Sequence, residues 1–174
     1  MSIIKKAKSD SSAFLHLYDL YVERIYNYIW RRIQNRNDAE DLTSMVWEKA
    51  LKNIKNLKSD EEHGFIAWLF AIARNELNQY FKDSQKYKHL ELLENHEDVC
   101  HGPAELANES FTENLIQTSL NSLPPKQKEA VELKYFADLR NQEIAKILEI
   151  SEKTVASNLV RALNTLKLSL QKLQ

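Results

Sequence analysis

Four side chains of the kinds that bind metals lie near one another in the middle of the sequence: His89, His96, Cys100 and His101. Imidazole and thiolate groups are the usual protein ligands of zinc. Zinc ligands normally come in closely spaced pairs separated by a longer loop, and these four residues do not follow that pattern. We therefore expect no metal site and no cofactor.

Motifs of covalent catalysis are also missing from the sequence. It contains no glycine-rich loop that would hold a phosphate, no nucleophile elbow and no HExxH string. We therefore expect a protein that acts by binding, not an enzyme.

The residues from Asn141 to Leu166 have the pattern of a helix-turn-helix. Ser151 can cap the second helix, whose inner face carries Val155, Leu159, Ala162 and Leu166. The outward positions are polar or small, as in a helix that lies in the major groove of DNA: Glu152, Lys153, Ala156, Ser157, Asn158 and Arg161. Two antiparallel core helices with one solvated face would give the same pattern, so this alternative stays open.

Apolar residues recur at helical spacing through most of the remaining chain. With only two glycines and three prolines, the sequence lacks the turn residues that a many-stranded sheet needs. We therefore predict an all-α protein with long helices over about 11–33, 37–57 and 65–86, followed by a shorter one over 125–136. Asn37 or Asp38 is the expected N-cap of the second of these helices.

Residues 87–108 separate two helical parts. They lack sustained periodicity, carry one lysine against five acidic residues, and include the breaker pair Gly102 and Pro103. We predict two small helical domains, over 10–86 and 109–172, joined by a flexible acidic linker over 87–108. The net charge of −1 argues against a protein that holds nucleic acid by bulk electrostatics alone.

The sequence also suggests a compartment. Cys100 is the only cysteine, and the longest apolar run, Phe65 to Ala73, is too short to cross a bilayer. The first ten residues have no apolar core of the length found in secretory signals. These observations favour a cytoplasmic protein that does not insert into a membrane.

Three strings resemble a known family. Residues 38–50 (DAEDLTSMVWEKA) and 65–75 (FIAWLFAIARN) are similar to the second region of sigma-70 factors. Residues 122–127 (SLPPKQ) and the helix-turn-helix resemble the fourth region, in the expected order. Since the chain shows no acidic N-terminal region and no middle domain, it looks like the extracytoplasmic-function (ECF) group of the family.

The resemblance implies a function. Such proteins direct the RNA polymerase core to promoters, and here a stress- or envelope-responsive regulon is expected. The first domain would bind the polymerase clamp and open the minus-10 element, and the second would bind the minus-35 element and the polymerase flap. Relatives are often inhibited by an anti-sigma factor, so the resemblance also implies such a partner.

The resemblance also assigns residues to three surfaces. The clamp would contact Asp38, Glu40, Asp41, Leu42 and Trp47, although Leu42 and Trp47 also fit an ordinary core. Minus-10 DNA would contact Leu57, Ile72, Asn75, Tyr80, Lys82 and Lys86, with the loop 57–64 holding a flipped base; Trp68 matches the motif but its position favours the core. Minus-35 DNA would contact Asn141, Lys153, Thr154, Ala156, Ser157, Asn158 and Arg161.

Several positions depart from the family pattern. Ala156 and Asn158 stand where relatives commonly have basic residues, so the minus-35 contact is expected to be weak or differently specified. Glu149 replaces a turn glycine, which is tolerable unless the turn requires a left-handed backbone. Ser44, Met45 and Gln79 also differ from the usual residues.

Two other functions fit parts of the sequence. A free-standing helix-turn-helix regulator would bind a palindrome without polymerase. A helical adaptor would have no DNA-reading residues at all. Neither explains the strings at 38–50 and 65–75.

Overall fold

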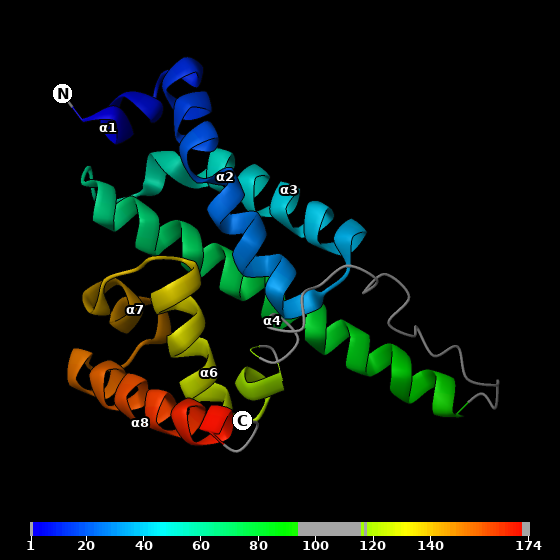
Figure 1. The fold of residues 1–174 in the computed structure, drawn as a ribbon. Coiled ribbons are helices and arrows are strands. Elements are labelled where there is room, and N and C mark those ends of the chain that lie inside the picture. Colours follow the sequence, from blue (N-terminus) through cyan, green and yellow to red (C-terminus); the bar gives the residue numbers. More distant parts are fainter. Residues whose placement is uncertain (1, 94–115, 117, 172–174) are drawn as a thin grey trace.

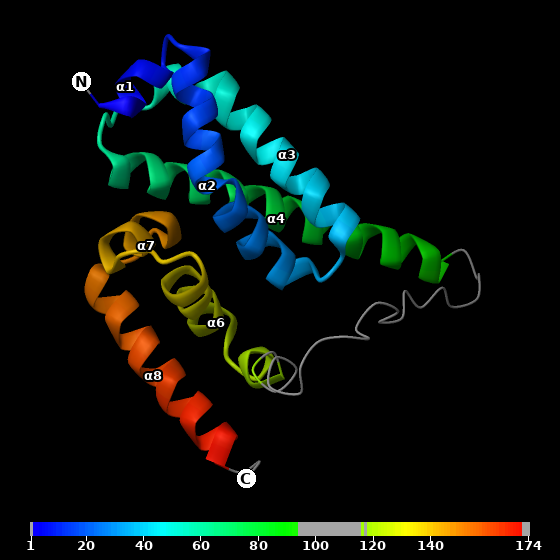
Figure 2. The same cartoon turned by 45° about the horizontal axis from the view of Figure 1, so that its top comes forward.

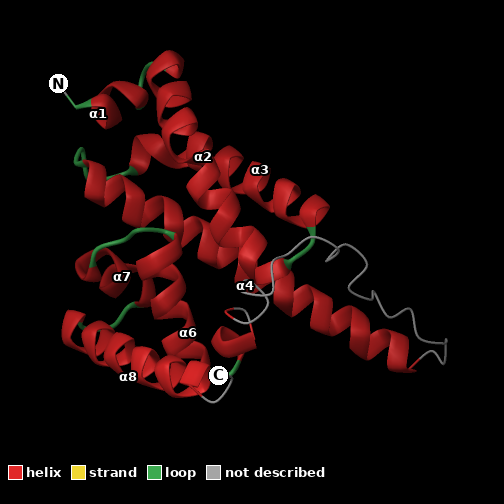
Figure 3. Ribbon diagram, viewed as in Figure 1, coloured by secondary structure: helices red, strands yellow, loops and turns green. Residues whose placement is uncertain are grey.

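The computed structural model describes residues 2–93, 116 and 118–171; the side chains of 86–93 and 170 are outside the described part. Every regular element in these residues is a helix or a helical turn (Figure 1 and Figure 3). The predicted all-α class is therefore confirmed.

The first unit consists of α1 (Ile3–Ala7), α2 (Ser11–Ile33), α3 (Arg36–Asn53), the short 3-10 turn η1 (Ile54–Asn56) and α4 (Glu62–Leu93). Helix α1 was not predicted. The predicted N-cap of α3 was wrong, because Asn35 is the cap and its side-chain oxygen accepts a hydrogen bond from the Asp38 backbone N–H at 3.2 Å. Helix α4 begins earlier and ends later than the pattern indicated.

The core of the first unit lies where α2, α3 and α4 meet. The predicted apolar stripes face it: Ile25 and Ile29 of α2, Val46 of α3, and Leu69 of α4 are completely buried. The ring of Tyr28 packs edge-on against Phe70, with the centroids 5.4 Å apart. Fully buried alanines on α3 and α4 let these two helices approach closely: Ala39, Ala50 and Ala73.

The second unit contains the helix-turn-helix. It consists of α6 (Pro125–Val131), the π-helical turn η2 (Glu132–Phe136), α7 (Asn141–Leu148) and α8 (Glu152–Gln171). As predicted, Ser151 precedes α8 and its hydroxyl accepts a hydrogen bond from the Thr154 backbone N–H at 3.1 Å. Val155, Leu159 and Ala162 are buried on the inner face of α8.

The turn between α7 and α8 contains a left-handed glutamate. Glu149 has φ 55° and ψ 41°. The backbone N–H groups of Glu149 and Ile150 both donate to the carbonyl of Ala145 in the last turn of α7. The turn thus requires the conformation that a glycine would adopt without steric cost.

The two units pack against each other. Helix α7 lies beside the first half of α4, and η2 contacts α2, whereas α8 lies on the far side of the second unit (Figure 2). Arg32 donates to Glu132 at 2.8 Å, and Arg74 donates to Glu129 at 2.8 Å. Burial raises the pKa of Glu132, and the Arg32 charge opposes that shift.

Further polar contacts extend this interface. The carboxylate of Glu143 accepts from the Arg140 backbone N–H at the start of α7 and lies 3.0 Å from Nδ1 of His63 on α4. The guanidinium of Arg31 lies 4.0 Å from the centre of the Phe136 ring. The interface therefore includes several charged groups, of which Glu132 and Glu143 are the most buried.

Replacing Glu149 by glycine is expected to stabilise the second unit. Glycine removes the left-handed strain but costs some chain entropy, so the net gain in the free energy of unfolding should be about 1 kcal/mol. Chemical denaturation measures it. The control Lys146→Gly, an exposed position in the neighbouring α7, should lose stability instead. Lower stability of Glu149→Gly would contradict the left-handed turn.

Reversing the charge of Glu132 should separate the two units. Glu132→Lys places a cation beside buried Arg32, so small-angle scattering should show a radius of gyration clearly above the value of about 16 Å expected for a compact chain of this length. The double variant Arg32→Glu/Glu132→Arg restores opposite charges and should become compact again. Glu152→Lys, an exposed acid on α8, is the control. A compact Glu132→Lys protein would count against this interface.

Candidate nucleic-acid interface

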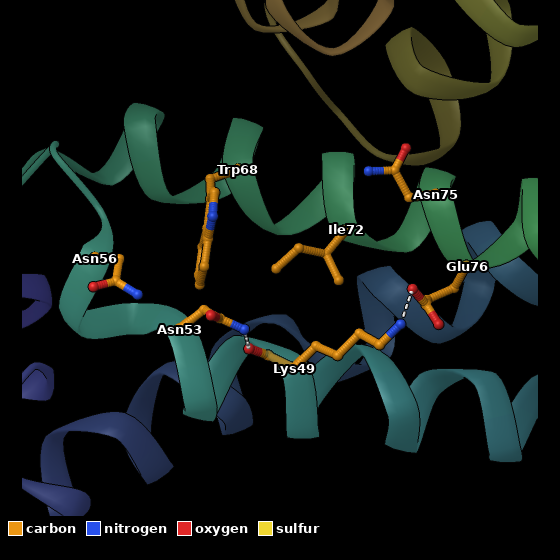
Figure 4. A pocket seen from close by; sticks show the side chains of 7 residues that line it. All are labelled: Lys49, Asn53, Asn56, Trp68, Ile72, Asn75 and Glu76. Carbon is orange, nitrogen blue, oxygen red and sulfur yellow. Dashed lines mark hydrogen bonds and ion pairs between the residues drawn. The ribbon is translucent and has the colours of Figure 1, made fainter.

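A pocket of about 520 Å³ lies between α3 with η1 on one side and α4 on the other. Its lining combines amides, an ion pair and two apolar side chains: Lys49, Asn53, Asn56, Trp68, Ile72, Asn75 and Glu76 (Figure 4). Its volume is within the usual range for small-molecule pockets. The expected cluster of Ile72, Asn75 and the residues near Leu57 is thus brought together around one cavity.

The apolar wall of the pocket comes from α4. Trp68 and Ile72 are partly buried, and both side chains project from α4 toward α3 (Figure 4). Trp68 was favoured as a core residue; it packs against the core and also lines the pocket. A flat aromatic ring beside an aliphatic side chain is suited to stacking against an unpaired base.

The polar groups of the pocket can make paired hydrogen bonds. Asn53 donates to the Lys49 carbonyl of its own helix at 2.9 Å, which leaves its side-chain oxygen available. Asn75 is exposed at the rim, and its amide points away from Trp68 and Ile72 in Figure 4. An exposed side chain changes rotamer within nanoseconds, so this amide can turn toward a bound base.

An ion pair closes one end of the pocket. Nζ of Lys49 lies 2.6 Å from a carboxylate oxygen of Glu76, which is 8% exposed. Sequence reasoning missed Lys49, Asn53, Asn56 and Glu76. The one-turn spacings from 49 to 53 and from 72 to 76 would have placed these residues on two facing helix sides.

Tyr80 links two of the predicted surfaces. Its hydroxyl donates to Asp38 of α3 at 2.6 Å. Burial, together with the hydrogen bond to the negative carboxylate, raises the pKa of Tyr80 to about 12. Asp38 belongs to the predicted clamp set and Tyr80 to the minus-10 set, so one hydrogen bond joins them.

The other residues predicted for the clamp fall into two groups. Glu40 and Asp41 are exposed on α3, and Glu40 accepts from Arg36 at 2.9 Å. Leu42 and Trp47 are 7% and 4% exposed. The Trp47 ring packs against Phe14 and Tyr18. Leu42 and Trp47 are therefore buried beneath the exposed residues of this surface.

The other residues predicted for minus-10 DNA lie around the pocket and along α4. Leu57 directly follows η1 and is partly buried, whereas Lys82 is exposed beyond Tyr80. The side chain of Lys86 lies outside the described residues.

The predicted minus-35 residues gather at the start of the helix-turn-helix and on α8. Asn141 begins α7 and is partly buried. Asn158 is partly buried on α8, and the remaining members are exposed there: Lys153, Thr154, Ala156, Ser157 and Arg161. Because α8 lies away from the first unit, this outward face is open to a ligand (Figure 2).

Metal-ligand clusters and long apolar helices would point to other functions. No group of three or more His, Cys, Asp or Glu side chains in this part of the chain is arranged to hold a metal ion. His96, Cys100 and His101 lie outside it, as does the side chain of His89. Among the helices described, none is both long and apolar enough to cross a membrane.

Comparison with known proteins identifies the family. Sigma-70 region 2 matches residues 17–87, and sigma-70 region 4 matches residues 113–166. The chain belongs to the sigma-70 family. The ECF RNA polymerase sigma factor BldN of Streptomyces coelicolor is 31% identical over 170 residues, which cover 95% of this chain and 64% of BldN. The ECF factor SigW of Bacillus subtilis is 28% identical, with 95% and 93% covered.

Solved structures share the fold of this sigma factor. CnrH, solved with the cytosolic domain of CnrY, has a TM-score of 0.74 at 18% identity, covering 98% of this chain and 96% of CnrH. RpoE of Bartonella quintana, solved with the anti-sigma factor NepR, has a TM-score of 0.71 at 23% identity, covering 91% and 96%. The predicted membership of the ECF group is confirmed.

Removing Asp38 is expected to lower the pKa of Tyr80. The folded-state pKa of about 12 exceeds the ordinary value of 10, so this tyrosine stabilises the fold below pH 10 and loses that contribution as pH rises toward 12. Tyrosinate absorbance, compared with Tyr80→Phe, isolates the titration. Asp38→Ala should shift it down but leave it above 10, since burial remains, and Asp41→Ala should not move it. A wild-type midpoint at 10 would refute the link.

Proposed function

We propose that this sigma factor directs the RNA polymerase core to promoters and starts transcription there, without covalent chemistry of its own. The observation that carries the proposal is the pairing of two DNA-reading surfaces in one chain. One is the pocket between α3 and α4, which suits an unstacked base. The other is the exposed face of α8 in a helix-turn-helix.

The residue roles follow from these surfaces. Asn75, Trp68 and Ile72 hold a base flipped from the minus-10 element, and Tyr80, Lys82 and Lys86 follow the separated strand. Arg161, with the neighbouring outward residues of α8, reads the minus-35 element. Glu40 and Asp41 contact the polymerase clamp, and the second unit contacts the flap. The proposed domains are 10–86 and 109–172, joined by the acidic segment 87–108, of which residues 87–93 continue α4.

Polymerase supplies the affinity that this nearly neutral chain lacks. Once docked, the two units act as linked modules, so binding of one raises the effective concentration of the other. The work takes place in the cytoplasm, and the promoters belong to a stress- or envelope-responsive regulon. An anti-sigma factor is proposed as a further partner, since RpoE and its anti-sigma factor NepR form a complex.

The packed arrangement of the two units has a consequence for this function. Elements about 25 base pairs apart are separated by about 85 Å along B-DNA. A compact chain with a radius of gyration of about 16 Å is only about 40 Å across. The units must therefore separate, breaking the contacts of Arg32 and Arg74 with Glu132 and Glu129, before both elements can be bound.

Run-off transcription with bacterial core RNA polymerase on genomic fragments tests the function. We expect transcripts only when the full chain is added. Arg161→Ala should reduce initiation about 5- to 100-fold, because a base or phosphate contact in the groove is lost. Lys167→Ala, an exposed cation farther along α8, should leave initiation nearly unchanged.

A gel shift without polymerase separates this proposal from the free-standing regulator. A sigma factor should bind duplex promoter DNA weakly when alone. Tight binding of a palindrome by the isolated chain, together with no transcript from any template, would favour the regulator. An adaptor would show neither activity, and Arg161→Ala would then change nothing.

A further inference from the structure

Helix α1 contacts the loop of residues 57–61, which directly follows the pocket residue Asn56. Asn56 lines the pocket, and Leu57 directly follows it. The loop then connects to Glu62 at the start of α4. Turn bonds tie the two ends of the loop, since the Leu57 N–H donates to the Ile54 carbonyl and the Glu61 carbonyl accepts from the Phe65 N–H, both at 3.1 Å. The residues between these ends also depend on contacts from outside the loop.

Lys8 holds the loop at two points. Its ammonium group donates to the Leu57 carbonyl at 2.6 Å and to a carboxylate oxygen of Asp60 at 2.6 Å. The Ser2 hydroxyl donates to the Asp60 carbonyl. The Lys8 side chain is 22% exposed and that of Asp60 is 44% exposed, so water partly screens the ion pair between them. The hydrogen bond from Lys8 also lowers the pKa of Asp60.

Helix α1 is a firm support for these contacts. Ile4 is 1% exposed and Ala7 is 5% exposed, so the short helix is anchored in the core beside α2. The backbone of Lys8, which directly follows α1, is therefore held in place by this helix. Lys5 and Lys6, on the same helix, are exposed.

Ser59 fixes the loop from the other side. It lies against Gly64 in the first turn of α4, where an added Cβ would be 2.4 Å from the Ser59 Cβ and 2.1 Å from its Oγ. Only glycine leaves room for this approach. The loop is thus held between α1 and α4.

We infer that Lys8 is a positioning residue for promoter reading: it sets the loop 57–61, and with it Asn56, at the distance from Trp68 and Ile72 that admits a flipped base. This inference rests on the function proposed above. Lys8 itself touches no DNA. Its loss should loosen the choice of base at the pocket while leaving the polymerase-binding surface of α3 intact.

Selection from a promoter library with randomised minus-10 bases tests this role. The full chain, bound to bacterial core polymerase, should lose about tenfold of its base discrimination in Lys8→Met, the effect expected for losing a charged donor with two acceptors. Lys8→Arg keeps the charge and the donors and should retain most of the discrimination. Lys6→Met, which removes an exposed charge from the same helix, should behave like the wild type.

Hydrogen exchange of the amides of residues 57–61 gives a second measurement. These amides should exchange faster in Lys8→Met, with the amides of α3 unchanged. Unaltered loop exchange, or unaltered base preference with polymerase affinity retained, would overturn the inference. Equal loss of polymerase affinity and base preference would assign Lys8 to general stability and overturn it as well. If the wild-type chain gives no transcript, the proposed function itself fails, which is a distinct result.

Discussion

The close antiparallel packing of α3 against α4 is the constraint on which the candidate site depends. It is made possible by small residues on both helices, since Ala39, Ala50 and Ala73 are completely buried. Two polar pairs cross this seam: Lys49 with Glu76 beside the pocket, and Asp38 with Tyr80 one turn farther along α4. A slip of one helical turn, about 5.4 Å, would break both pairs and separate the two walls of the pocket.

Helix α4 has three neighbours, and this explains its sequence. One side packs into the core through Phe70 and Leu69, a second faces α3, and a third meets the second unit through Arg74 and His63. A helix that is used on most of its circumference shows only a weak apolar stripe. The apolar string from Phe65 to Ala73 therefore revealed the helix but not the position of its ends.

The sequence alone predicted the parts of the fold that follow from local patterns. The stripes of α2, α3 and α8 were found because burial forces apolar residues to recur once per turn. The helix-turn-helix was found in the same way, and the family strings pointed to the candidate site residues. Helix α1 was missed because five residues are too few to show a period. The pocket was only partly predicted, because Lys49 and Glu76 are distant in sequence and meet through tertiary packing. The consequence of Glu149 depended on whether the turn was left-handed, which only the backbone could show.

The charges at the interface between the units bear on the near neutrality of the chain. Arg32 and Arg74 of the first unit are paired with Glu129 and Glu132 of the second, so cations and anions cancel across the contact. Separation of the units would return the cations to the first unit and the carboxylates to the second. The first unit would then expose more positive charge than it does in the packed arrangement, and this charge would attract a phosphate backbone more strongly. A chain with a net charge of −1 can thus expose more positive charge on its first unit when its two halves are apart. Contact between the halves therefore covers arginines that separation would expose.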